Sequence, residues 1–217
     1  MKKIDKSICL ASEYLNWQQS TNAKYYSSHK YYKDVLCSLI ICQNGLCAYT
    51  EYRLISENEL EKIKALFDSS GRYRKARPDI PMDNEHFDSI KKNVNGWNWD
   101  NFFGVFSPIN RDVKRVRESE LIKNGKNIHS FFKPDNPNYN PKIYLNYDIK
   151  NHMFYPNPNL DSVTFKETKE MIYILGLNWG FIRMKRKEYI SEYLKRKEYF
   201  NNERINQFYT AIELLEM

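Results

Sequence analysis

Hydrophobic residues recur at helical spacing in the first third of the chain. Residues 10–42 carry Tyr, Trp, Val, Leu and Ile at mixed helical intervals, with a break or cap predicted at Ser20–Asn22. The segment 56–67 predicts a second helix, and Ser56 stands three residues before Glu59, which is the capping-box arrangement. Its apolar side chains line one helical face: Leu60, Ile63, Leu66 and Phe67.

Shorter patterns follow further along the chain. Asn44–Gly45 indicates a turn, and the alternation after it is typical of a short strand. A second short strand is predicted at His86–Phe87. Ser107–Pro108 is a favourable helix start, with proline in the first turn. Residues 124–160 are rich in Pro and Asn and predict loops with a hairpin, whereas 162–217 predict two or three helices. The helix after Pro108 is expected to carry three polar side chains outward: Asn110, Lys114 and Arg117.

These elements favour one α+β domain with helical flanks. We expect a single domain over residues 1–217, divided into a helical lead-in (1–43), a core (44–123) and a carboxy-terminal part of loop, hairpin and helices (124–217). The sequence shows neither an internal repeat nor a low-complexity linker.

Composition narrows the class of protein. With 34 Lys+Arg against 27 Asp+Glu, the net charge is +7, which favours polyanionic partners such as nucleic acid. Many aromatic residues and a mean hydropathy of −0.74 indicate a globular protein rather than a disordered one. No run of 18 apolar residues and no signal-peptide core is present, so we expect a cytoplasmic protein with no membrane partner.

The cysteines argue against a structural metal of the zinc-finger kind. All four lie in the first quarter of the chain: Cys9, Cys37, Cys42 and Cys47. A zinc knuckle takes its ligands from two separated pairs, and no cysteine follows position 47.

The stretch "DNEHFDSI" (83–90) places a carboxylate directly before a histidine. Taken alone, it favours an ordinary imidazole on an acidic loop. However, Asn101 follows His86 by fifteen residues and Asn110 follows Asn101 by nine. These intervals suit a strand, a loop, a second strand and a helix whose ends converge. The pattern therefore makes His86 a candidate for chemistry. The other histidines have no partner motif and are left out of the site: His29, His129 and His152.

The motifs in this region resemble a known family. "GLCAYTE", "EHF", "NWDNFFGVF", "FSPIN" and "LGLN" occur in this order between about residues 17 and 186. They resemble the HNH endonucleases of the ββα-metal fold and, more closely, the family that includes the PtuB nucleases of the Septu anti-phage system. The resemblance implies a ββα-metal core with helical extensions at both ends. It also implies a metal-dependent endonuclease of prokaryotic defence, with a PtuA-like ATPase as a possible partner and DNA favoured over RNA as substrate.

The chain departs from this family at the zinc ligands. Thr50 stands at the second cysteine of the knuckle, and Phe106 and Ile109 stand at the two cysteines before the helix. Cys47 remains, and one thiolate cannot hold a structural zinc ion. We hypothesise that packing of Phe106 and Ile109 replaces the metal. The departure leaves two alternatives open: a stand-alone restriction-like nuclease, and a catalytically inactive nucleic-acid-binding or scaffold protein of a defence complex.

The resemblance assigns a role to each retained residue. Glu85 and Asn110 would hold Mg²⁺ or Mn²⁺ through oxygen atoms, the ligands that hard ions prefer. His86 would be the general base that activates water. Asn101 would hold the loop and orient the imidazole. Asp88 is a weaker metal candidate than Glu85, because its side chain is expected to point elsewhere.

Basic residues frame these motifs. We expect phosphate contacts from one cluster before the site and one after it: Arg72, Arg74, Lys75 and Arg77, and then Arg111, Lys114, Arg115 and Arg117. A third run lies in the predicted carboxy-terminal helices: Arg183, Lys185, Arg186 and Lys187. Together they favour a nucleic-acid groove over three unrelated solvated faces.

Overall fold

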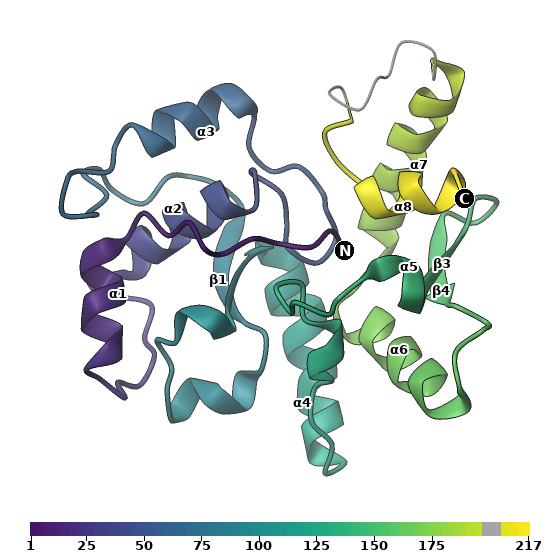
Figure 1. The fold of residues 1–217 in the computed structure, drawn as a ribbon, viewed down its shortest axis with the longest axis horizontal. Coiled ribbons are helices and arrows are strands. Elements are labelled where there is room, and N and C mark those ends of the chain that lie inside the picture. Colours follow the sequence, from purple (N-terminus) through teal and green to yellow (C-terminus); the bar gives the residue numbers. More distant parts are fainter. Residues whose placement is uncertain (197–204) are drawn as a thin grey trace. The chain divides into compact units, whose positions relative to one another are not determined.

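The chain forms two compact units. The structure is a computed structural model that describes residues 1–196 and 205–217 (Figure 1). The amino-terminal unit comprises Ile4–Ala48 and Leu54–Asn110, and the carboxy-terminal unit comprises Met1–Lys3, Tyr49–Arg53 and Arg111–Met217. The boundary after Asn110 falls within the segment 44–123 predicted as the core.

The amino-terminal unit pairs two strands and packs helices against them. Its helices are α1 (Ser12–Gln19), α2 (Tyr32–Cys42), α3 (Glu57–Lys64), and the 3-10 turns η1 (Ser89–Asn93) and η2 (Trp99–Asn101). Its strands are β1 (Met82–His86) and β2 (Phe102–Phe106). Helix α3 has the predicted capping box: Ser56 Oγ accepts from the Glu59 amide, while Glu59 accepts from the Ser56 amide. The break predicted at Ser20–Asn22 is confirmed, but the helix predicted to resume directly after it is wrong, because irregular chain fills residues 20–31 and α2 begins at Tyr32.

Strands β1 and β2 are antiparallel, with Met82 opposite Phe106 and His86 opposite Phe102. Helix α2 packs on the face of this pair that bears Met82, whose side chain is fully buried. Asn84 Nδ2, two residues on, donates to Tyr32 O at 3.0 Å on the same helix. Because side chains alternate along a strand, His86 shares this face, whereas Asp83 and Glu85 lie on the other.

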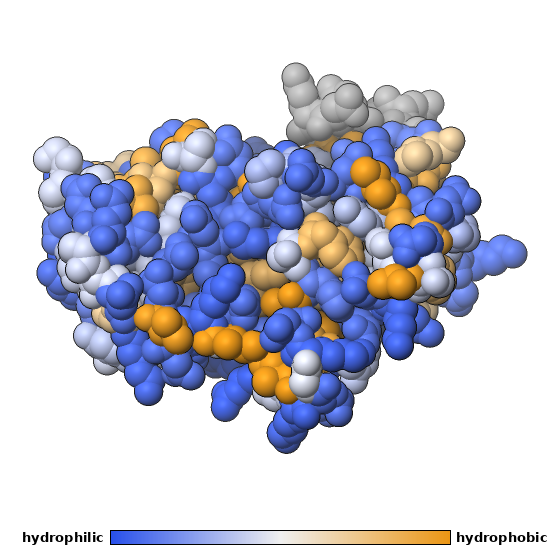
Figure 2. All heavy atoms as spheres, turned by 60° about the horizontal axis from the view of Figure 1, so that its bottom comes forward, coloured by the Kyte–Doolittle hydropathy of each residue, from blue (hydrophilic) through white to orange (hydrophobic). Residues whose placement is uncertain are grey.

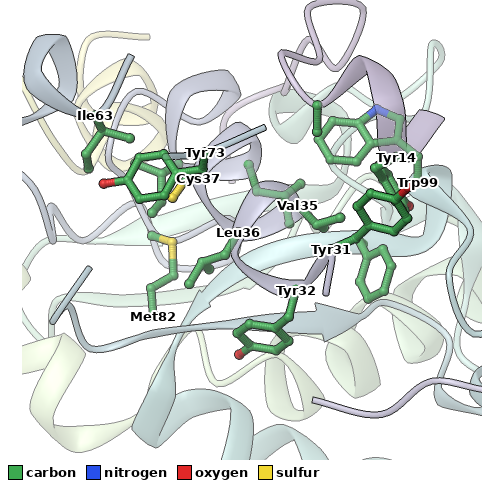
Figure 3. Packing of buried hydrophobic residues seen from close by; sticks show 14 of the residues in the cluster. Tyr14, Tyr31, Tyr32, Val35, Leu36, Cys37, Ile63, Tyr73, Met82 and Trp99 are labelled. Atoms are coloured by element: carbon green, nitrogen blue, oxygen red, sulfur yellow. The ribbon is translucent and has the colours of Figure 1, made fainter. Parts of the chain in front are cut away.

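The core of the amino-terminal unit lies between α2 and its neighbours. Figure 3 shows the aromatic rings of Tyr14, Tyr31 and Trp99 at one end of the cluster. Leu36 lies near its middle, and Met82 lies toward the opposite end. Burying one such aliphatic side chain contributes roughly 1.5–3 kcal/mol. The packing therefore holds β1 firmly against α2.

A continuous helical stretch follows β2. It starts at Ser107 and Pro108, as predicted, and continues as a π-helical segment over Ile109–Lys114 and as α4 over Arg115–Lys123. The strand pair followed directly by a helix has the order of elements that the resemblance implies. Such π segments are frequent at functional sites.

The carboxy-terminal unit contains a hairpin and helices. The hairpin pairs β3 (Leu145–Asp148) with β4 (Met153–Pro156), and thus confirms the hairpin predicted within 124–160. Besides α4, its helices are η4 (Ser130–Phe132), α5 (Pro141–Tyr144), α6 (Ser162–Ile174), α7 (Gly180–Lys195) and α8 (Tyr209–Leu215). The last three confirm the helices predicted over 162–217. Within that range, residues 197–204 lie outside the described residues.

The mixture of helices with two small antiparallel sheets confirms the α+β class. The short strand predicted after Asn44–Gly45 is wrong. Asn44, Gly45 and Glu51 all have positive φ angles (52°, 71° and 58°), which interrupt an extended chain. Leu54 N donates to Gly45 O at 2.9 Å, so this segment folds back as a knuckle.

The surface is largely hydrophilic. Figure 2 shows one face on which hydrophobic side chains form small scattered groups among polar ones. In the described part of the chain, no helix combines the length and the apolar character needed to cross a bilayer.

Candidate active site

His86 ends β1 and is held from both sides. Its side chain is 3% exposed, and its Nε2 lies 2.7 Å from Gly96 O. A carbonyl oxygen only accepts hydrogen bonds, so Nε2 carries a hydrogen, and the neutral form of the ring would have its lone pair on Nδ1. The rings of Tyr25 and Phe102 pack on the imidazole at centroid distances of 4.6 and 4.5 Å. The orientation and the tautomer are thus set by the fold.

Asn101 fastens the chain that follows His86. Its Oδ1 accepts from the Asp88 amide at 3.0 Å, and its Nδ2 donates to Asp88 O at 2.9 Å. Its own carbonyl accepts from Phe87 N at 2.8 Å. Three hydrogen bonds therefore close the loop between β1 and β2 directly beyond the histidine. These contacts are the ones that Asn101 would have to make if its role is to hold this loop without touching a metal, as predicted.

Oxygen ligands gather on the other face of β1. Asn110 Nδ2 lies 3.3 Å from Asp83 Oδ2, so the chain just after β2 reaches back to the start of β1. Glu85 shares this face with Asp83 because the two are two positions apart on the strand. Sequence reasoning selected Glu85 and missed Asp83, although the two-residue alternation was a signal for it.

These oxygen atoms fit a hard cation. Two carboxylates and an amide oxygen match the ligand chemistry of Mg²⁺, which keeps several waters and takes few protein ligands. Among the described residues, no three His, Cys, Asp or Glu side chains form a metal-holding group by themselves. Asp83 is already engaged by a cation, since Arg77 NH2 lies 3.3 Å from its Oδ1.

The knuckle is fastened to β2 by hydrogen bonds. Gln43 Nε2 donates to Leu46 O and Gly104 O, and its Oε1 accepts from Gly104 N, all at 2.7 Å. Cys47 Sγ accepts from Phe106 N at 3.4 Å.

Phe106 and Ile109, the two residues of the packing hypothesis, are 9% and 0% exposed. This burial is what the packing hypothesis requires. All four cysteines are free thiols.

The basic cluster before the site is only partly directed to solvent. Arg72 Nε lies 2.7 Å from Asp34 Oδ2, and its NH1 lies 3.2 Å from Glu13 Oε1. Burial alone would lower the pKa of Arg72, but the two carboxylates outweigh it and raise this pKa above its ordinary value. Arg74 and Lys75 are exposed. Arg72 is thus a structural ion pair, and its neighbours are the better candidates for phosphate.

Two predicted outward-facing cations are buried. Lys114 is 0% exposed and lies 2.6 Å from Glu118 Oε2, so the expectation that it points outward to phosphate is wrong. The helical stretch turns this position inward, toward a carboxylate one turn later. Arg186 is also 0% exposed and donates to His152 O and Leu177 O.

The remaining cations of the second cluster differ in their surroundings. Arg111 and Arg115 are exposed. Arg117 lies over the Tyr173 ring, with 4.1 Å to the centroid, and donates to Tyr173 O.

No known family model matches the chain, and a search of the curated proteins finds no relative. The candidate site therefore stands on its own geometry and on the motifs that it contains.

Proposed function

We propose that this protein is a metal-dependent endonuclease of the HNH type. One observation carries the proposal: an antiparallel strand pair leads directly into a helix, and three features lie on or beside this pair, with the histidine on one face of β1 and the oxygen ligands on the other. These features are the oriented imidazole of His86, the Asn101 clamp on the following loop, and the Asn110–Asp83 contact. The resemblance supports the same reading from the sequence motifs.

Each residue has a task in phosphodiester hydrolysis. His86 Nδ1 takes a proton from the attacking water, while Nε2–H on Gly96 O holds the ring and disperses the resulting charge. Asp83, Glu85 and Asn110 would hold Mg²⁺. When bound, this ion would neutralise charge on the scissile phosphate and the leaving oxygen. Asn101 is a positioning residue, since it acts through the backbone of Asp88.

Access to His86 is part of this proposal. Phe102 is fully buried on β2, whereas Tyr25 lies on the irregular segment 20–31 and is partly exposed. Displacement of the Tyr25 ring is therefore the route by which water would reach the imidazole.

The 3% exposure of His86 also favours the second candidate, a catalytically inactive nucleic-acid-binding protein. The two candidates differ in whether bound nucleic acid is cut.

The deciding experiment incubates the protein with plasmid DNA, single-stranded DNA and bulk RNA, with Mg²⁺, with Mn²⁺ and with EDTA. Loss of a general base lowers the rate by about 10²–10⁴-fold, so His86→Ala should abolish cleavage. His129→Ala is the matched control, because His129 is partly buried in the carboxy-terminal unit. Circular dichroism establishes that each variant folds. Binding without cleavage in every metal would favour the inactive protein, and unchanged cleavage by His86→Ala would refute the assigned base.

The proposed role in anti-phage defence and the proposed ATPase partner rest on the resemblance alone. A neighbouring gene that encodes a P-loop ATPase, and co-purification of its product with this chain, would support assembly with a PtuA-like ATPase.

A further inference from the structure

The irregular segment between α1 and α2 alternates aromatic and basic residues. It reads "KYYSSHKYYK" over residues 24–33. Residues 14–33 contain three lysines and no aspartate or glutamate. The segment belongs to the amino-terminal unit, and neither the basic clusters nor the HNH motifs include it.

One ring of this segment stands on a rigid aromatic base. The His29 imidazole packs against the rings of both Trp17 and Trp97, with centroid distances of 4.6 and 4.5 Å and tilts of 32° and 42°. Tyr26 meets His29 at 5.0 Å and 76°, and it remains 52% exposed, whereas Trp97 is fully buried. Tyr26 is therefore an outward aromatic ring whose orientation is fixed from below.

The base under Tyr26 is uncharged at neutral pH. Burial, and secondarily the charge of Lys30, lower the pKa of His29 below its ordinary value. A neutral imidazole packed against two indoles keeps the cluster apolar, so positive charge is carried by the lysines around it.

Lysines surround the aromatic platform formed by Tyr26, His29, Trp17 and Trp97. Lys24 is exposed, and its carbonyl accepts from Trp97 Nε1 at 3.2 Å. Lys92 Nζ lies 5.1 Å from the centroid of the Tyr25 ring. Base stacking on an aromatic side chain, combined with lysines for the backbone phosphates, is the chemistry of single-strand recognition.

The platform is joined to the candidate active site. Gly96, whose carbonyl accepts from His86, donates its amide to Ala23 O at 3.2 Å. A Cβ at Gly96 would lie 2.5 Å from Tyr25 N, so only glycine permits this approach. Tyr25, the residue before Tyr26, packs its own ring on His86. A base on Tyr26 would thus lie close to the imidazole along the same segment.

We propose that Tyr26 stacks an unpaired base and that the substrate of this site is single-stranded nucleic acid. The nucleotide's phosphates lie with Lys24 and Lys92. A duplex hides the ring faces of its bases, so it cannot use this platform. The substrate assignment rests on the proposed nuclease function, but the binding site itself does not.

The test measures binding in EDTA, where no metal-dependent cleavage occurs. Fluorescence anisotropy follows labelled oligo-dT and oligo-U of about 12 nucleotides, beside a duplex of the same length. We expect the single strands to bind more tightly than the duplex, and Tyr26→Ala to weaken their binding about 10-fold. Tyr26→Phe keeps the ring and should bind as wild type. Tyr155→Ala is the matched control, since Tyr155 is 40% exposed in the carboxy-terminal unit.

Two further arms separate the possible outcomes. Lys24→Ala should lower the affinity for both single-stranded oligonucleotides and reduce the salt dependence of binding. The comparison of oligo-dT with oligo-U tells whether DNA or RNA is preferred. Equal affinity for duplex and single strand, or unchanged binding by folded Tyr26→Ala, would overturn the proposal. Tyr26-dependent binding without cleavage in any metal would sustain it and overturn the nuclease. Cleavage that needs His86 but not Tyr26 would sustain the nuclease and overturn the proposed base-stacking role of Tyr26.

Discussion

Replacing Asn101 should loosen the loop beyond His86 and lower the unfolding free energy by a predictable amount. Its side chain is 4% exposed and makes two hydrogen bonds to the Asp88 backbone. A typical hydrogen bond contributes about 1 kcal/mol net, so Asn101→Ala should lower the unfolding free energy by about 2 kcal/mol. Asn101→Asp keeps the acceptor for the Asp88 amide but sets a carboxylate oxygen against the Asp88 carbonyl. It should therefore destabilise the unit at least as much, although its volume is nearly unchanged.

Urea unfolding followed by tryptophan fluorescence measures this cost in the right place. Three of the four tryptophans, Trp17, Trp97 and Trp99, belong to the amino-terminal unit, so the emission reports mainly its unfolding, and Trp179→Phe removes the signal of the other unit. Asn98→Ala is the matched control on the same loop, because its side chain caps η2 with one hydrogen bond to Asp100 N. It should cost about 0.5–1 kcal/mol. If Asn101→Ala costs less than the control, the clamp on the Asp88 backbone is refuted. If the nuclease proposal holds, Asn101→Ala also slows cleavage while single strands still bind.

Three more perturbations test other parts of the structure. Lys114→Met leaves the buried Glu118 carboxylate without the Lys114 cation, so it should lower the unfolding free energy by about 3–5 kcal/mol. Adding Glu118→Leu should restore most of this loss. Equal melting temperatures of wild type and Lys114→Met would contradict the buried pair. The pKa of His29 lies below its unfolded value of 6.5, so its neutral form stabilises the fold above that pH. Stability should fall as the pH drops below 6.5, by at most about 1.4 kcal/mol per pH unit for this one group, and His29→Gln should flatten the profile in a urea titration at several pH values. Ser56→Ala removes the capping box with Glu59 and should cost about 1 kcal/mol, whereas an unchanged midpoint would show that α3 does not need its cap.

Local signals in the sequence predicted local structure well. The capping box at Ser56 and the helix start at Ser107–Pro108 both depend on side chains a few residues apart, and both are confirmed. The hairpin within 124–160 follows from short apolar pieces beside turn residues and is likewise present. Asn44–Gly45 correctly indicated a turn, but the strand predicted after it was wrong, because the chain folds back there and Glu51 takes a positive φ angle that its residue type does not indicate.

Long-range contacts decided the placements that the sequence did not reveal. Lys114 was expected outside because basic residues flank it, but the helix turns it inward onto Glu118. Arg72 pairs with Asp34, which lies 38 residues earlier on α2. A pattern read along the chain has no access to such partners. Asp83 is different, because its place beside Glu85 follows from strand alternation once the strand is known to begin at Met82.

The strand pair that carries His86 is braced without a complete set of zinc ligands. Gln43 spans the knuckle and β2 through three hydrogen bonds, and its amide pairs with both backbone groups of Gly104 as a neighbouring strand would. A Cβ at Gly104 would meet Met82 Sδ at 2.6 Å and Gln43 Nε2 at 3.2 Å, so this close approach depends on glycine. Cys47 adds a sulfur acceptor for Phe106 N on the same strand. Because these contacts join β2 to the knuckle directly, hydrogen bonds and close packing hold the frame around the histidine.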